Sequence, residues 1–279
     1  GEAVQLYEAK FGFNQNTHRI AVGEPLGQFY GYITEGLYQV DDFNYDASTQ
    51  TYTLKDGVPY HGDKGQIRPG MWKFKNLTGD DNVIDENDKT VIGNAQPKFY
   101  GGLNNSFTYK GFDLSIFLTF SYGNEVLNAT KLVTSKVGSL NYNALDVMNS
   151  SNRWMTINTE GEKVTDPGEL AVLNAGKTVA VYHDAQQGDN YIHSWAVEDA
   201  SYLKLSNVTL GYTFPKNLIA RVGLKNLRLY ATGNNLLTWT KYSGFDPEVS
   251  TMKSGLTPGV DFGAYPLSRS FIFGLNVAF

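Results

Sequence analysis

The densest group of side chains able to bind a metal ion is an acidic cluster between residues 80 and 88. It comprises Asp80, Asp81, Asn82, Asp85, Asn87 and Asp88. Oxygen ligands at regularly spaced positions are typical of a calcium loop. Asp81, Asp85 and Asp88 stand at suitable positions, but Leu77 occupies the first ligand position and Asn82 the position of the usual glycine. Two interpretations remain, a degenerate calcium site at Asp81, Asp85 and Asp88 or a solvated acidic loop, and the imperfect match favours the loop.

Other groups suited to catalysis are sparse. The sequence has no cysteine, which excludes disulfides, thiolate chemistry and cysteine-ligated metals. It also has no nucleophile-elbow, P-loop or dinucleotide-binding motif. Its four histidines lack a third ligand at a recognisable spacing, and we expect them to be exposed loop residues: His18, His61, His183 and His193. We therefore predict that the protein is not an enzyme and that it requires no cofactor, calcium being the one possible ligand ion.

Aromatic side chains in the irregular segments are candidates for binding. Trp195, Trp239 and Tyr265 stand near the ends of predicted strands, where aromatic residues of membrane proteins gather at the interface with water. Trp154 stands in the middle of a long irregular segment and directly follows Arg153. We expect Arg153 and Trp154 to contact a ligand or a partner protein.

The elements that must position these residues are β-strands. The clearest pattern runs from Phe112 to Tyr122, where apolar residues alternate with mostly small polar residues, which indicates a strand with two different faces. The polar faces carry Ser, Thr, Asn, Gly and Tyr where a soluble sheet would carry Lys, Glu and Arg. Strands of about ten residues with this alternation are typical of a lipid-spanning barrel. We predict strands near residues 3–11, 99–109, 111–123, 199–214, 225–235 and 269–279.

The predicted connections alternate between short and long. Lys110-Gly111 and residues 215–224 are short links, whereas residues 41–97, 124–197 and 236–267 form long loops without strong periodicity. Short turns on the periplasmic side and long loops outside are typical of outer-membrane barrels. About six strands are too few to close a barrel, because the smallest such barrels have about eight. We expect further strands from elsewhere to complete it.

Composition agrees with a membrane wall. Aromatic residues make up 14% of the chain and charged residues 18%, whereas charged residues are roughly 25% of an average soluble domain. No run of about 18 apolar residues occurs, so no transmembrane helix is expected. The net charge of -5 argues against a nucleic-acid partner, which would require clustered Lys and Arg.

Several motifs resemble, in order, the C-terminal third of the SusC/RagA family of TonB-linked outer-membrane proteins. The segments lie at Gly23–Tyr32, Trp72–Phe99, Asn104–Gly123, Asp199–Pro215, Asn226–Glu248 and Tyr265–Phe279. The resemblance implies an all-β fold, the C-terminal portion of a large transmembrane β-barrel of about 22 strands with long extracellular loops. It also implies an N-terminal barrel and plug portion, a SusD-like surface lipoprotein, TonB, which would act through the N-terminal part, and a position among the lipids of the bacterial outer membrane. The terminal Phe279 resembles the signal by which the barrel-assembly machinery recognises its clients.

The sequence leaves the function open between classes. The preferred prediction is TonB-dependent import of an oligosaccharide or a peptide, with this chain as barrel wall and extracellular loops. One alternative is a soluble all-β carbohydrate-binding or glycan-processing module, in which the strands pack as a sandwich. Another is a passive surface or scaffold barrel. Partition with outer membranes would separate the first from the second, and dependence on TonB would separate it from the third.

Overall fold

The computed structural model describes the backbone of residues 4–7 and, with side chains, residues 16–79, 81–135, 143–180, 191–251 and 254–279. The chain divides into two compact units. The first, here called the loop unit, comprises residues 1–94, 127–197 and 252–262. The second, the sheet unit, comprises residues 95–126, 198–251 and 263–279. No helix within the described ranges is both long enough and apolar enough to cross a membrane.

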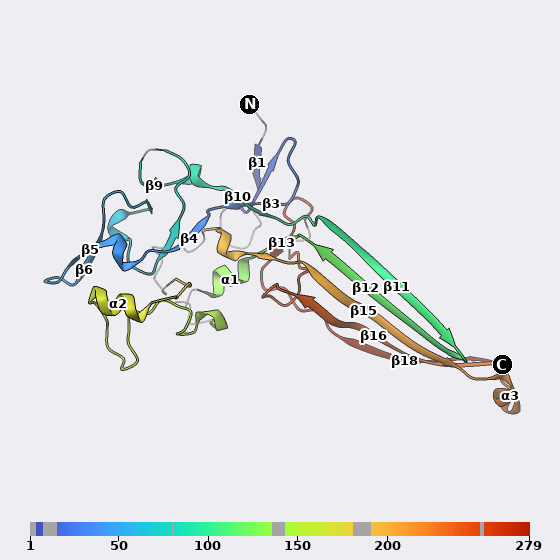
Figure 1. Ribbon diagram of the computed structural model, residues 1–279. Coiled ribbons are helices and arrows are strands. Elements are labelled where there is room, and N and C mark those ends of the chain that lie inside the picture. Colours follow the sequence, from blue (N-terminus) through green and yellow to red (C-terminus); the bar gives the residue numbers. More distant parts are fainter. Residues whose placement is uncertain (1–3, 8–15, 80, 136–142, 181–190, 252–253) are drawn as a thin grey trace. The chain divides into compact units, whose positions relative to one another are not determined.

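The sheet unit is built on one antiparallel sheet with the strand order β11-β12-β15-β16-β18 (Figure 1). Its strands are β11 (Phe99–Tyr109), β12 (Phe112–Tyr122), β15 (Tyr202–Thr213), β16 (Asn226–Thr240) and β18 (Ser270–Ala278). The short helices α3 (Lys216–Ile219) and η6 (Ala220–Val222) connect β15 to β16. Strand β16 continues five residues beyond the predicted end at residue 235, so the expected loop 236–267 begins inside a strand.

Register gives the sheet two different faces. One row across four strands consists of leucines alone, because Leu103 pairs with Leu118, Leu118 with Leu205 and Leu205 with Leu237. On this face the side chains stay uncovered, and Phe273 is 81% exposed. The opposite face carries a polar row in which the hydroxyls of Thr209 and Thr232 are 2.8 Å apart. The sheet therefore has one apolar surface without a covering layer and one surface of small polar groups.

A two-residue turn closes the hairpin of β11 and β12. Lys110 and Gly111 have φ angles of 47° and 89°, and two successive positive φ values are those of the type I′ turn that suits twisted hairpins. A Cβ on Gly111 would lie 2.7 Å from the carbonyl oxygen of Thr213. Both the backbone angle and the close approach of β15 therefore require glycine here, as the Lys110-Gly111 spacing predicts.

The loop unit consists of short strands in small sheets. One sheet has four strands, β1 (Val4–Tyr7), β2 (His18–Ala21), β3 (Gln28–Gly31) and β10 (Thr90–Asn94). Three pairs are β4 (Thr34–Leu37) with β8 (Trp72–Phe74), β5 (Phe43–Asp46) with β6 (Thr51–Leu54), and β7 (Tyr60–His61) with β9 (Val83–Ile84). The strand predicted at residues 3–11 is described over Val4–Tyr7, where it pairs with β2 and not with the five-stranded sheet. Residues 3 and 8–11 lie outside the described residues.

The remaining elements are short. They are β13 (Glu125–Asn128), β14 (Val197–Asp199), β17 (Val260–Asp261), α1 (Ala129–Thr134), α2 (Pro167–Leu173), η1 (Val40–Asp42), η2 (Lys64–Gln66), η3 (Glu86–Asp88), η4 (Asp146–Met148) and η5 (Ser194–Ala196). Side-chain caps begin several of them. Asp166 accepts a hydrogen bond of 3.0 Å from the backbone nitrogen of Glu169 at the start of α2, which satisfies one of the free donors of its first turn.

The predicted long loops contain packed cores, which the lack of periodicity did not suggest. One core joins Tyr38, Phe43, Leu54, Ile67 and Met71. A second brings Leu37 and Val40 against Trp154, Leu170 and Ala180, which come from a segment more than a hundred residues later. Such contacts between distant segments bury enough apolar surface to order chain that lacks long regular elements.

Candidate functional site

A charged hollow of about 580 Å³ opens in the loop unit. It is lined by Glu35, Gly36, Leu37, Gln39, Asp42, Lys73, Lys177 and Thr178. Strands β4 and β8 bring the first and middle parts of this set together, since Gly36 pairs with Lys73 in an antiparallel register. The hollow therefore combines side chains that are far apart in the sequence and that carry both signs of charge.

Asp42 organises the acidic side of the hollow. Its Oδ2 accepts a hydrogen bond of 2.8 Å from the backbone nitrogen of Gln39, and its Oδ1 lies 3.0 Å from Nζ of Lys73. The ammonium of Lys73 also stands 5.6 Å from the centre of the Tyr38 ring, within the range of a cation–π contact. Lys73 is thus held in place, whereas Glu35 is exposed.

The basic side of the hollow depends on the segment around Trp154. The backbone nitrogen of Trp154 donates a hydrogen bond of 2.9 Å to the carbonyl oxygen of Val179. The backbone nitrogen of Thr178 donates one of 3.1 Å to the carbonyl oxygen of Asn152. These bonds fix Lys177 at the edge of the hollow. Arg153 forms an isolated β-bridge with Val179, two residues after Lys177, and burial together with the charge of Arg153 lowers the pKa of Lys177.

The prediction for Arg153 and Trp154 needs a correction in part. Trp154 is 1% exposed and belongs to the core with Leu37 and Leu170, so its ring is a core side chain and presents no surface to a ligand. Apolar packing accounts for its position better than recognition does. Arg153 is half-buried and its guanidinium lies 3.5 Å from the sulfur of Met155. Its proximity to Lys177 relates it to the hollow.

The sequence did not single out the residues that line this hollow. Glu35, Asp42, Lys73 and Lys177 are ordinary charged residues in segments without periodicity, and no motif marks them. Only the pairing of β4 with β8 and of residues 152–154 with 178–179 brings them together. Their mixed charges, one amide and one hydroxyl can hold a polar solute or a protein loop by hydrogen bonds and ion pairs.

A buried cluster of aromatic and histidine side chains lies elsewhere in the loop unit. His193 is 3% exposed. The centre of its ring lies 5.1 Å from that of Trp72 and 5.3 Å from that of Phe74. Its Nδ1 and the hydroxyl of Thr34 share a hydrogen bond of 2.9 Å. His61 is 4% exposed and packs 5.1 Å from the same Phe74 ring. The expectation that the histidines are exposed is wrong for these two because aromatic rings cover both.

Burial also decides the charge of these histidines. It lowers the pKa of His61 to about 4, and burial together with the charges of Lys131 and His61 lowers the pKa of His193 to about 3. His18 is buried as well, and burial lowers its pKa to about 4 although Pro258 accepts a hydrogen bond from its ring. All three are therefore neutral at pH 7. His183 lies outside the described residues.

The acidic loop is ordered by its own hydrogen bonds. Oδ1 of the buried Asp88 accepts bonds of 2.6 and 2.8 Å from the backbone nitrogens of Leu77 and Thr78, and its Oδ2 accepts one of 2.8 Å from Asp85. Burial opposes ionisation of Asp88, but these bonds outweigh it and lower its pKa. Asp85 and Asp81 accept bonds from the backbone of Asn87 and Val83.

These bonds give the carboxylates a structural role. Within the described residues, no group of three or more acidic or histidine side chains is placed to hold a metal ion, and Asp80 lies outside them. Calcium binding at Asp81, Asp85 and Asp88 stays a prediction. The assembly role of Phe279 also stays a prediction: its ring is exposed and follows directly after β18.

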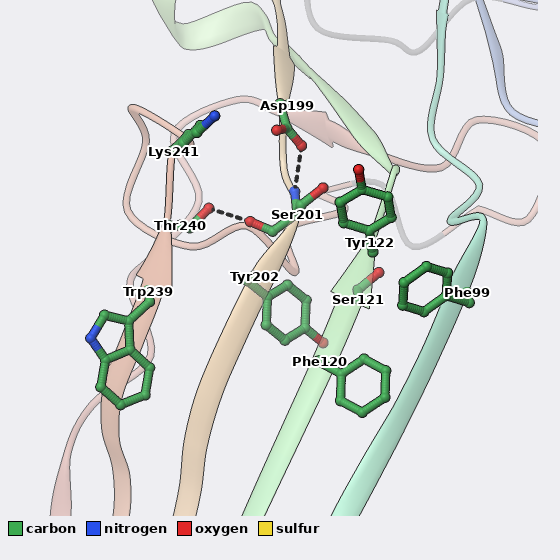
Figure 2. A pocket seen from close by; sticks show the side chains of 10 residues that line it. All are labelled: Phe99, Phe120, Ser121, Tyr122, Asp199, Ser201, Tyr202, Trp239, Thr240 and Lys241. Carbon is green, nitrogen blue, oxygen red and sulfur yellow. Dashed lines mark hydrogen bonds between the residues drawn. The ribbon is translucent and has the colours of Figure 1, made fainter.

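Another hollow, of about 510 Å³, lies in the sheet unit, at the end of the strands away from the Lys110-Gly111 turn (Figure 2). It is lined by Phe99, Phe120, Ser121, Tyr122, Asp199, Ser201, Tyr202, Trp239, Thr240 and Lys241. Aromatic rings form much of its wall, and Phe99 stacks on Tyr122 with ring centres 5.0 Å apart. Asp199 and Lys241 give it one charge of each sign.

Comparison with known proteins shows which proteins share this sequence. The chain is 34% identical over 95% of its length to TonB-dependent receptor P3 of Formosa agariphila, and 30% identical over 78% of its length to TonB-dependent receptor SusC of Bacteroides thetaiotaomicron. The chain belongs to the SusC-type TonB-dependent receptors. It spans 23% and 18% of the length of these two relatives. No family model matches the chain.

Solved structures give the same fold. The chain is similar to the structure of the RagAB peptide transporter with a TM-score of 0.61 and 20% identity, covering 99% of this chain and 24% of that one. The sequence-based prediction of fold is confirmed: the chain is a C-terminal portion of the β-barrel of a TonB-dependent receptor. TonB-dependent receptors of this type are outer-membrane proteins, so the chain is located in the bacterial outer membrane. Its relatives are named as receptors and transporters and not as enzymes, which agrees with the absence of catalytic motifs.

Proposed function

We propose that this chain forms part of the wall and the extracellular loops of a TonB-dependent importer of oligosaccharides or peptides. The observation that carries the proposal is the two-faced sheet of a SusC-type receptor, with an uncovered apolar surface and a surface of small polar groups. A lipid bilayer requires the first surface and an aqueous lumen the second. The chain performs no bond chemistry in this function.

The polar face is suited to line a lumen. Arg228 donates from Nε and from a terminal guanidinium nitrogen to the two carboxylate oxygens of Asp113, at 2.9 and 2.5 Å. This bidentate pair passes over Gly211, where a Cβ would lie 2.5 Å from both partners. Arg228 and Asp113 therefore neutralise each other on this face through charge-assisted hydrogen bonds.

The charged hollow of the loop unit is the proposed contact for solute or for a surface lipoprotein. Its Lys73 and Lys177 can bind carboxylate or other anionic groups, and Glu35 and Asp42 can bind hydroxyl or ammonium groups. The partners that this function requires are the remaining barrel and plug of the receptor, a SusD-like lipoprotein at the surface, and TonB, which supplies the work through the plug.

Uptake by the full-length receptor in its own bacterium tests the proposal. A double variant, Lys73→Gln with Lys177→Gln, is expected to lower uptake of labelled oligosaccharide or peptide at an unchanged amount of receptor in the outer membrane. Lys75→Gln is the matched control, because Lys75 is exposed and does not line the hollow. Deletion of TonB is expected to abolish uptake, and uptake that persists without TonB would instead favour a passive barrel.

A soluble carbohydrate-binding or glycan-processing module is the competing function. Such a module would be released from washed outer membranes without detergent and would not change its electrophoretic mobility on boiling. The exposed apolar face predicts the opposite for this chain, namely retention in the membrane fraction and heat-modifiable migration.

A further inference from the structure

The connection between β15 and β16 is basic and has no acidic residue to balance it. Its cations are Lys216, Arg221 and Lys225, and residues 200–245 contain no Asp or Glu. All three residues are exposed. Within the residues that the structure describes, none of the three forms an ion pair. The positive charge of this connection is therefore available to an anion from outside the chain.

The same connection exposes two apolar side chains. Leu218 and Val222 are 53% and 71% exposed, and they stand four residues apart across α3 and η6, which makes them neighbours on a helical surface. Ile219 is buried, and its carbonyl oxygen accepts a hydrogen bond of 3.2 Å from the backbone nitrogen of Leu224. Ile219 thus holds the connection in place, while a small apolar surface beside the cations stays uncovered.

The connection follows directly after the aromatic edge of the apolar face. Phe112 pairs with Tyr212, with ring centres 4.5 Å apart, and the rings of Tyr212 and Phe214 lie 5.0 Å apart. In a barrel such rings mark the level of the lipid–water interface. Lys216 follows Phe214 by two residues, roughly 7 Å of extended chain at most, and the headgroup layer on each side of a bilayer is about 5–8 Å thick. The short helix α3 therefore begins at the depth of the headgroups.

The whole of this end of the sheet is positive. Figure 1 shows α3 at the strand ends that also hold the turn between β11 and β12, and Lys110 in that turn is a further exposed cation. The strand segments that form this end are residues 105–117, 206–232 and 270–279. Their one acidic side chain, Asp113, is already bonded to Arg228. The surface that complements this end is therefore anionic.

We infer that the connection between β15 and β16 docks on the periplasmic leaflet of the outer membrane and binds phospholipids with a net negative headgroup. Short connections face the periplasm in outer-membrane barrels, and the leaflet on that side is built of phospholipid. Lys216, Arg221 and Lys225 contact the phosphates. Leu218 and Val222 enter the region of the upper acyl chains, as the apolar residues of interfacial helices do. The inference rests on the membrane position of the sheet in the proposed function and not on the solute transported.

Quenching of a fluorophore on the helix by brominated lipids tests the inference. The full-length receptor carries the fluorophore on Asn217→Cys, because Asn217 is exposed and this chain has no cysteine of its own. It is reconstituted in phosphatidylcholine vesicles that contain a small fraction of brominated phosphatidylglycerol or of brominated phosphatidylcholine. We expect phosphatidylglycerol to quench at about a tenfold lower mole fraction than phosphatidylcholine, since each cation near an anionic surface favours binding about fivefold. Added salt should reduce this preference.

Substitutions in the labelled receptor separate the charged from the apolar contacts. Arg221→Gln is expected to reduce the preference for phosphatidylglycerol about two- to fivefold. Leu218→Ser with Val222→Ser is expected to weaken quenching by both lipids alike, because the helix then lies further from the acyl chains. Lys241→Gln, which removes an exposed cation at the opposite end of the sheet, is the matched control and should change nothing. Heat-modifiable migration of each variant shows that its barrel has folded.

Three results would overturn the inference. Equal quenching by the two lipids at low salt would show that the connection does not select anionic lipid. A preference that is unchanged in Arg221→Gln would show that the cations do not make it. Quenching by iodide in the water but by neither lipid would place the helix in the periplasm, where its partner would be a protein.

Failure of the inference is distinguishable from failure of the proposed function. A folded barrel with heat-modifiable migration and TonB-dependent uptake, but without lipid preference, refutes only the lipid contact. A receptor that leaves the membrane without detergent refutes the membrane position of the sheet, and with it both proposals.

Discussion

The two units of the chain use aromatic and aliphatic residues in opposite ways. In the sheet unit the backbone ladder supplies the order and the large apolar side chains stay uncovered, as with Phe273. In the loop unit the strands are only two to five residues long, and the order comes from buried rings such as Trp154 and Phe74. Apolar residues therefore face the surroundings in one unit and make the core in the other, so the same substitution has different consequences in each.

The largest effect is expected where the loop unit packs most tightly. Gly70 has a φ of 85°, and a Cβ there would lie 2.3 Å from the Trp154 ring, so Gly70→Val cannot be accommodated without displacing that ring. We expect it to destabilise the loop unit by about 3–5 kcal/mol, as much as Trp154→Ala, which leaves a large cavity. Hydrogen exchange of peptides around residues 67–74 measures the loss. Phe273→Ala, in the exposed face of the sheet, is the contrast and should leave exchange there nearly unchanged.

A charge on the apolar face tests the other half of the comparison. Val208→Arg is expected to cost about 2–4 kcal/mol because it places a cation against lipid near the middle of β15. Thr209→Arg, one residue later and on the polar face, is expected to cost much less. The measurement is the denaturant midpoint of folding of the full-length receptor into vesicles. Equal costs for the two substitutions would contradict the assignment of the faces.

Acid should weaken the loop unit before the sheet. The folded pKa of His61 is about 4, below the roughly 6.5 of an unfolded histidine. As pH falls below about 6.5 the unfolded state binds a proton that the folded state does not, and stability falls until the folded form also titrates near pH 4, by up to about 3 kcal/mol. Exchange of the loop unit measured between pH 7 and 4 should rise beyond its intrinsic pH dependence, and His61→Phe should remove part of that rise.

The smallest effect is expected at the acidic loop. Asp88→Asn keeps the shape of the side chain, but its single oxygen can accept only neutral bonds from Leu77 and Thr78. Its NH2 group then faces the backbone N–H of Asp85 and that bond is lost, at a total cost of about 1–2 kcal/mol. Exchange of the amides of Leu77 and Thr78 reports it. Calorimetric titration with calcium on the same variant sharpens the result: calcium heat in the wild-type receptor that is absent in Asp88→Asn would support the metal site, and no heat in either would dispose of it.

Local pattern was enough for the sheet and for the family. Alternation with a period of two belongs to each strand by itself, so the residues from Phe112 to Tyr122 revealed both faces, and Lys110-Gly111 revealed the turn. The pattern could not fix where β16 ends, because Leu236 to Thr240 continue a strand without strict alternation. Nor could it show that Val4–Tyr7 pairs with β2, since the choice of a strand partner is a long-range decision.

The sequence by itself determined that this chain has strands with one apolar and one polar face, and which residues stand on each. Only the tertiary structure decided that the long loops have cores, that Trp154, His61 and His193 are buried, and that Lys73 and Lys177 share a hollow. The physical reason is the range of the contacts. The face of a strand residue follows from its immediate neighbours, whereas burial in the loop unit depends on segments such as Leu37 and Trp154 meeting across more than a hundred residues.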